Sequence, residues 1–330
     1  MKDLKHLYEF EKLLESANNA LVQQACAEGK HALAYTCYHM PEVLLNTGNC
    51  FSVRLRAPLT GSLDISSYYM SNFICDYCKS LLERGIEGGY NFLSGLMGTE
   101  TCSEMNRALE HFELLQLVDN EQFFVTFLDM PFKVTENTVR HYVDQLRRKV
   151  LTPLQEVYGV DVSDDALRKA VADHNEVCRI LTEIGQFRKE ENPRITGYEY
   201  HILNLVSYCC PKYLIVDKLR ETLEELRQRE PDVKPRFRVK IAVVGSEIDA
   251  RRGRPFLLRL NAGARGNSSR PRPAGAREHR APLPQHQPVP ALHAARESRR
   301  PLAARARPVR GVSRAGRAVR AAQVLRILGL

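Results

Sequence analysis

The stretch VKIAVVGSEID, residues 239–249, decides the predicted fold class. Its first seven residues form a largely apolar run that ends in Gly245, which is the pattern of a strand buried on both faces. Such strands belong to parallel sheets whose faces are covered by helices, so the run predicts an α/β fold and the first strand of a new α/β unit. The chain of 330 residues has room for one large domain or two ordinary ones.

The sequence after residue 249 does not continue this unit. Residues 250–330 contain 19 Arg, no Lys and two acidic residues, Glu278 and Glu297, whereas all nine Cys and all 13 Tyr precede them. The formal net charge of +9 is therefore the balance of +17 in this segment and −8 in residues 1–249. A segment of this composition cannot bury enough apolar surface to offset the entropy of ordering, which predicts a disordered basic tail.

Two interpretations of this tail are open. A natural basic tail would bind nucleic acid or acidic surfaces through its charge. Alternatively, GC-rich coding DNA that is read out of frame yields Arg, Ala, Pro and Gly without Lys. We favour the shifted frame because the break cuts the expected unit after its first strand, and resequencing around codon 249 separates the two. Nothing in residues 1–249 resembles a nucleic-acid module, so we expect no nucleic-acid partner.

The sequence before residue 239 shows further strands and helices. Phe51–Leu55 and Phe123–Leu128 are predicted strands of one parallel sheet, and residues 136–230 are predicted to be mostly helical, with Thr135 or Thr138 and then Ser163 as caps. The predicted organisation is an N-terminal helix in residues 1–34, an α/β unit in 35–135, a helical segment in 136–236, the first strand of an incomplete second unit in 237–249, and the tail in 250–330.

The predicted location is the cytoplasm. No run of 18 apolar residues is present, so no membrane-spanning helix is expected. The first residues, MKDLKHLYEFEKLLES, are amphipathic and lack the apolar centre of a signal peptide. Nine cysteines without an export signal are typical of a reducing compartment, in which thiols bind metals or fill cores.

Three of these cysteines stand close to predicted helix starts. Cys75 and Cys78 lie in ICDYCKSLL, and Cys102 begins TCSEMNRALEHFELL. A thiol at a helix N-terminus meets the positive end of the helix dipole, which favours the thiolate that binds a metal. A single CxxC motif is also compatible with core packing, and a zinc or redox protein built on Cys75 and Cys78 is a third possibility.

A longer set of motifs resembles a known family. The motifs are YHMPEVLLNTGNCFSVRL (38–55), NFICDYCKSLLE (72–83), GTETCSEMNRALEHF (98–112), FFVTFLDMPFK (123–133), the helical stretch 136–190, PRITGYE (193–199) and VKIAVVGSEID (239–249). In this order and spacing they resemble a subunit of the 2-hydroxyacyl-CoA dehydratases, of the 2-hydroxyglutaryl-CoA dehydratase D-component type, and of the related ATP-dependent benzoyl-CoA reductases.

The resemblance implies a cofactor and its ligands. Family subunits have two Rossmann-like units joined by helices and hold a [4Fe–4S] cluster through three Cys. By resemblance Cys75 is the first ligand and Cys102 the second, which makes 35–135 the cluster-binding unit, while Cys78 is expected to be a packing or supporting residue. The third family ligand lies beyond residue 249, where this sequence has no Cys, and this departure leaves both cluster assembly and the activity of this polypeptide open.

The resemblance also implies the reaction. Family enzymes are oxygen-sensitive lyases that dehydrate a 2-hydroxyacyl-CoA to an enoyl-CoA through a ketyl radical. The electron comes from a separate ATP-hydrolysing iron–sulfur activator, and the enzyme is a heterodimer with a homologous second subunit. Glu42 matches an acidic position near the substrate and is the expected proton donor or acceptor for the leaving hydroxyl, unless it only suits the first turn of a helix; His39 could assist. A subunit of the benzoyl-CoA reductase type is the alternative.

Overall fold

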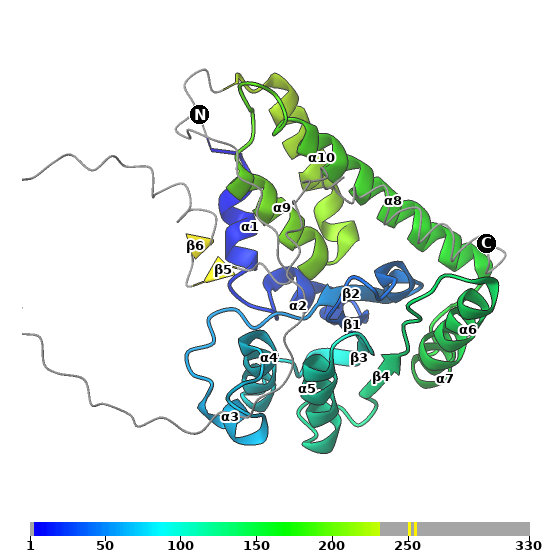
Figure 1. The fold of residues 1–330 in the computed structure, drawn as a ribbon. Helices are drawn as coiled ribbons and strands as arrows, with labels where there is room; N and C mark the ends of the chain where they lie inside the picture. Colours follow the sequence, from blue (N-terminus) through cyan, green and yellow to red (C-terminus); the bar gives the residue numbers. More distant parts are fainter. Residues whose placement is uncertain (1–2, 232–249, 252–253, 256–330) are drawn as a thin grey trace, which may run out of the picture. The chain divides into compact units, whose positions relative to one another are not determined.

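The computed structural model describes residues 3–231, 250–251 and 254–255 (Figure 1). These residues belong to one compact unit. The short strands β5 (Ala250–Arg251) and β6 (Arg254–Pro255) pair antiparallel. The strand predicted in 239–249 and the rest of the predicted tail lie outside the described residues.

A parallel sheet of four strands is the centre of the described fold. The strands are β1 (His31–Tyr35), β2 (Cys50–Arg54), β3 (Leu93–Thr99) and β4 (Phe124–Leu128), and their order in the sheet is β2-β1-β3-β4. The two predicted strands are β2 and β4, each within one residue of its expected bounds, and they are the edges of the same parallel sheet. The predicted α/β class is therefore confirmed.

The two central strands were not predicted, and the single helix predicted for residues 1–34 was wrong. That interval holds two helices, α1 (Leu7–Leu13) and α2 (Ala20–Ala27), and most of β1. The break occurs because the side chain of Asn19 caps α2 by accepting hydrogen bonds from the N–H groups of Leu21 and Val22. The sequence did not predict β3 as a strand because LSGLMGT contains two glycines, which ordinarily weaken a strand.

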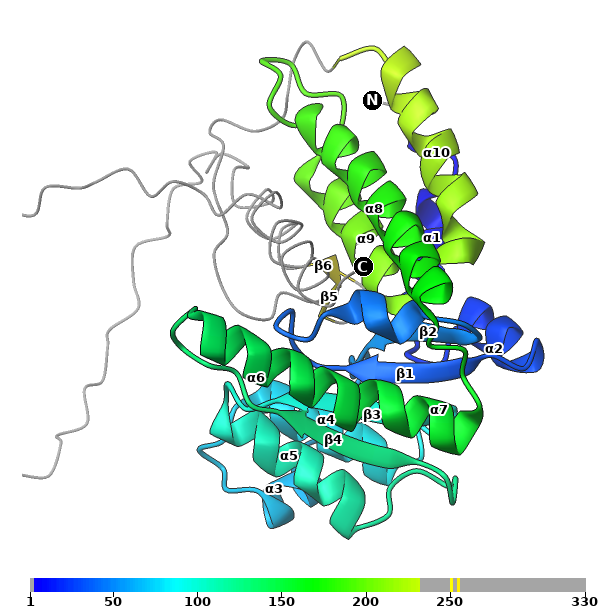
Figure 2. The same cartoon turned by 90° about the vertical axis from the view of Figure 1, so that its right-hand side faces the viewer.

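Helices cover both faces of the sheet (Figure 2). On one face, α2, α4 (Asp76–Ile86) and α5 (Ser103–Leu114) pack on the strands, and α3 (Asp64–Tyr69) packs on α4. On the other face lie η1 (Glu42–Asn46), α6 (Glu136–Leu146), the π-helical turn η2 (Arg147–Leu151) and α7 (Thr152–Tyr158). Gly98 on β3 allows the close approach of α5, because a β-carbon there would lie 2.5 Å from Leu109 Cδ1.

A layer of helices has a hydrophobic core of its own, in addition to the cores on the two faces of the sheet. It consists of α8 (Asp164–Gln186), α9 (Gly197–Cys209) and α10 (Lys212–Gln228), together with α1. The predicted helical content of residues 136–230 is confirmed, and Thr135 and Ser163 cap α6 and α8 through their side chains. Among the described helices, none combines the length and the apolar character needed to cross a membrane.

The strand order places a switch point between β1 and β3. The chain moves from β1 outward to β2, and then returns past β1 to build β3 and β4 on the other side. Loops that leave the carboxyl ends of β1 and β3 diverge at this point, and open α/β sheets bind their ligands there. The segment that leads to Glu42 follows β1, and the segment that leads to Cys102 follows β3.

Candidate functional site

Two helices present a cysteine at their N-termini. Cys75 is the residue before α4 and Cys102 the residue before α5, and both are exposed. Neither side chain accepts a capping hydrogen bond from its helix, and the Cys75 thiol is hydrogen-bonded with that of Cys78 instead. Helices α4 and α5 pack beside each other on one face of the sheet (Figure 1). Their N-termini therefore lie at the same end of the sheet, where the carboxyl ends of the strands are.

A compact set of possible ligand atoms lies at this end of the sheet. Cys75 Sγ, Cys78 Sγ and a carboxylate oxygen of Glu104 all lie within 4.8 Å of one another. The backbone N–H of Cys75 donates to Glu104 Oε2 at 2.9 Å, which fixes the carboxylate of α5 against the start of α4. Glu104 was not among the predicted site residues, because no local sequence pattern distinguishes it from an ordinary acid in the first turn of a helix.

Cys78 lies on the inner side of this set. Its side chain is buried in the core between α4 and the sheet, in agreement with the packing role expected for it. Burial raises the pKa of its thiol, and negative charge on Cys75, Cys102 and Glu104 raises it further. Cys78 therefore lies beside Cys75, whereas Cys102 is not one of the three residues whose ligand atoms lie within 4.8 Å of one another.

Cys75 and Cys102 are ligands of the type that an iron–sulfur centre uses, while the sequence after residue 249 has no Cys to serve as the third family ligand. Iron–sulfur clusters are bound by thiolates, and Cys75 and Cys102 offer two exposed thiols beside two helix N-termini. The helix dipoles favour the negative charge of thiolates and of the cluster that they bind. Both cysteines lie on the surface and have room to turn toward a bound group.

Glu42 lies in a different cluster, on the opposite face of the sheet. Its carboxylate accepts a short hydrogen bond from the Tyr35 hydroxyl, and its Oε1 lies 3.4 Å from both His174 Nδ1 and Lys212 Nζ. Lys212 Nζ also lies 3.3 Å from Ser52 Oγ. These partners of the Glu42 carboxylate come from β1, α8 and α10, and none of them is one of the three cysteines.

The charges of this cluster are compensated inside the protein. The side chains of Glu42 and Lys212 are only 13% and 7% exposed. Burial by itself raises the pKa of Glu42, but Lys212, His174 and the Tyr35 hydroxyl outweigh burial and hold the pKa below its ordinary value. Glu42 is thus kept ionised, a state in which a carboxylate can accept a proton but cannot donate one.

This lowered pKa predicts how stability depends on pH. A carboxyl group whose pKa is lower in the folded state stabilises the fold above its unfolded pKa, near 4.5, and loses that contribution as the pH falls through its folded value. We expect the free energy of unfolding to fall more steeply below about pH 4.5 in the wild type than in Glu42→Gln. Urea titrations between about pH 3.5 and 6 measure this, and parallel curves for the two proteins would contradict it.

Other predicted residues have structural contacts. His39 accepts a hydrogen bond from the Tyr142 hydroxyl through its carbonyl, and its ring packs on Tyr38. Glu199 completes a capping box with Thr196 at the start of α9. Tyr35, His174 and Lys212 were not among the predicted site residues, because only the folded chain places them beside Glu42.

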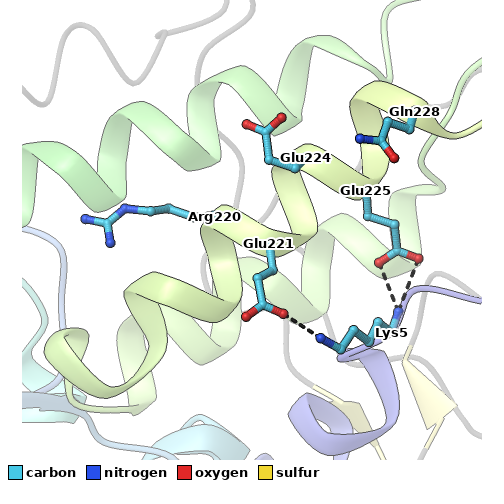
Figure 3. Close-up of a pocket in the computed structure, with 6 residues that line it drawn as sticks. All are labelled: Lys5, Arg220, Glu221, Glu224, Glu225 and Gln228. Carbon is cyan, nitrogen blue, oxygen red and sulfur yellow. Dashed lines mark hydrogen bonds and ion pairs between the residues drawn. The ribbon is translucent and has the colours of Figure 1, made fainter.

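A shallow hollow lies between the start of α1 and α10 (Figure 3). It is lined by Lys5, Arg220, Glu221, Glu224, Glu225 and Gln228. Lys5 Nζ pairs with Glu221 Oε2 at 2.7 Å, and the Lys5 backbone N–H donates to Glu225 Oε2 at 3.1 Å. Because these groups bind one another, the hollow is best understood as a polar contact that holds the N-terminal segment on α10.

Fold and site together define a class of protein: a parallel α/β protein that presents thiols on helix N-termini at one edge of its sheet. Over residues 37–263 the sequence matches the family described as 2-hydroxyglutaryl-CoA dehydratase, D-component. The match covers more than half of the chain, so the chain belongs to this family, and the resemblance stated from the motifs is confirmed.

Curated relatives agree with this assignment. The chain is 21% identical over 227 residues to the (R)-phenyllactyl-CoA dehydratase beta subunit of Clostridium sporogenes, covering 69% of this chain and 59% of the relative. It is 22% identical over 222 residues to the beta subunit of (R)-2-hydroxyglutaryl-CoA dehydratase from Acidaminococcus fermentans, covering 67% and 56%. It is 18% identical over 176 residues to a benzoyl-CoA reductase subunit of Thauera aromatica, covering 53% and 44%. The chain thus spans little more than half the length of the first two relatives.

Proposed function

We propose that this chain is an iron–sulfur subunit of a 2-hydroxyacyl-CoA dehydratase, with Cys75 and Cys102 as ligands of a [4Fe–4S] cluster. The observation that carries the proposal is the position of these two thiols at neighbouring helix N-termini, at the edge where open α/β sheets bind ligands. Two relatives of this chain are named as beta subunits of dehydratases that act on CoA thioesters. When bound, such a cluster supplies the single electron that the dehydration needs.

The residues of this chain have separate tasks in the proposed reaction. Cys75 and Cys102 hold the cluster at the carboxyl ends of the strands, and the N-termini of α4 and α5 offset its negative charge. Glu42 is the proposed proton acceptor, because its buried partners keep it ionised. An ATP-hydrolysing activator supplies the electron, and a reducing cytoplasm keeps the thiols reduced.

A homologous second subunit is the proposed partner. Three large apolar side chains are strongly exposed: Phe73, two residues before Cys75, and Phe132 and Val134 in the loop after β4. Strongly exposed apolar side chains of this size are typical of a surface that another chain covers. The relatives are themselves named as subunits, which supports a complex in which this surface is covered by the partner.

Cluster binding is tested by anaerobic reconstitution of the full chain with iron and sulfide. We expect the wild type to gain the broad visible absorbance of an iron–sulfur protein, and Cys75→Ser and Cys102→Ser to lose it, because a serine oxygen is a poor ligand for such a cluster. Iron and acid-labile sulfide are measured on each protein. Cys26→Ser, which changes a thiol of α2 away from the site, is the matched control and should load like the wild type.

The results of reconstitution separate the possible outcomes. Equal iron and sulfide in the wild type and in both serine variants would contradict the proposal. A second function, an aromatic acyl-CoA reductase, is favoured by the similarity to a benzoyl-CoA reductase subunit. Assay of the reconstituted complex with a 2-hydroxyacyl-CoA and with benzoyl-CoA distinguishes water loss from ring reduction.

A further inference from the structure

We propose that Cys75, Cys78 and Glu104 form a site for one divalent cation of borderline or soft character, such as Zn²⁺ or Fe²⁺, which binds in place of the cluster because both use Cys75. This site goes beyond the proposed cluster, because it uses Cys78 and Glu104 as ligands and holds a single ion. It does not require that the cluster assignment be correct.

The spacing of the donor atoms supports a single ion. A tetrahedral ion with sulfur ligands at about 2.3 Å and a carboxylate oxygen at about 2.0–2.2 Å places its donors roughly 3.5–3.8 Å apart. A [4Fe–4S] cluster needs ligand sulfurs roughly 6–7 Å apart. The atoms of Cys75, Cys78 and Glu104 all lie within 4.8 Å of one another, which is closer to the spacing of the single ion.

The arrangement is held in place before an ion arrives. Glu104 accepts the backbone N–H of Cys75, so its carboxylate is already fixed at the start of α4. The side chain of Cys78 is buried in the core and so lies on the inner side of the site. It follows Cys75 by one turn of α4, which fixes the spacing of the two residues. Cys75 is exposed, so the site is open to solvent on that side for entry of the ion.

The chemistry of the donors selects the kind of ion. Thiolates are soft ligands and favour Zn²⁺ and other transition metals over Mg²⁺ and Ca²⁺, which prefer oxygen. Several thiolates and a carboxylate on neighbouring helix N-termini would carry excess negative charge, which a divalent cation neutralises. Lys79, the nearest cation along α4, is paired with Asp76 at 3.0 Å and so does not take this role.

The test is an anaerobic titration of the reduced full chain with Co²⁺, which reports on thiolate ligands through a charge-transfer band in the near ultraviolet. We expect one equivalent of Co²⁺ to bind in tetrahedral geometry and one equivalent of Zn²⁺ to displace it. In Cys78→Ser and in Glu104→Gln we expect affinity to fall at least about tenfold, since even the loss of a group that supports a ligand costs about 10–100-fold. Cys26→Ser is the control and should bind like the wild type.

The outcomes for the ion and for the cluster are separable. Cys78→Ser should load iron and sulfide like the wild type if the cluster uses Cys75 and Cys102, yet lose tight binding of Co²⁺ if the ion site is correct. Unchanged Co²⁺ affinity in both Cys78→Ser and Glu104→Gln, or binding without a thiolate band, would overturn the ion site alone. Urea midpoints of the variants show whether each has folded, and Glu104→Gln, which changes a partly exposed side chain, keeps the test decisive if Cys78→Ser does not fold.

Discussion

Lys212→Met is expected to lower the free energy of unfolding by about 3–5 kcal/mol, because it removes the cation beside a buried carboxylate. Lys212 Nζ lies 3.4 Å from Glu42 Oε1, and both side chains are almost inaccessible to water. Methionine has a similar shape to the lysine stem, so the change removes the charge with little change in packing. Urea unfolding of the reduced chain measures the loss.

A double substitution tests whether the loss comes from the uncompensated charge. Lys212→Met combined with Glu42→Gln leaves no buried charge at either position, so we expect it to be less destabilised than the sum of the single changes. The matched control is Lys169→Met, because Lys169 is 80% exposed and its pair with Asp173 is worth at most about 0.5 kcal/mol. Equal losses in Lys212→Met and Lys169→Met would show that the buried pair does not hold the helical layer on the sheet.

Glu199→Ala is expected to cost a similar amount, about 3–5 kcal/mol, because Glu199 has two tasks in the helical layer. Its Oε2 accepts the backbone N–H of Thr196 at 2.7 Å and so completes the capping box of α9. Its Oε1 lies 3.0 Å from Arg229 Nη1, and both side chains are less than 10% exposed. Alanine removes the cap and leaves the guanidinium of Arg229 without this carboxylate.

Two further variants divide this loss between the cap and the ion pair. Glu199→Gln can still accept the N–H of Thr196, so its loss reflects mainly the ion pair and should be smaller than that of Glu199→Ala. Glu136→Ala is the control: Glu136 is also an acid in a first helical turn and pairs with Arg140, but it is 88% exposed. Its cost should be at most about 0.5 kcal/mol, and a loss in Glu199→Ala no larger than this would refute the buried role.

The sequence by itself determined the features that depend on neighbouring residues. The short runs that became β2 and β4 were predicted from the sequence as strands, because a strand depends on the pattern of a few neighbouring residues. Thr135 and Ser163 marked the starts of α6 and α8, because a helix start depends on groups within one turn of the chain. The same local reasoning placed Cys75 and Cys102 at helix N-termini.

The tertiary structure alone decided which distant residues meet. Strand β3 contains two glycines, and its place in the centre of the sheet depends on the close packing of α5 and β4 that those glycines allow. Glu42 meets His174 and Lys212, which follow it by more than 130 and 160 residues, and no local pattern encodes such pairs. Glu104 reaches Cys75 for the same reason, because a contact between two helices depends on how both pack on the sheet.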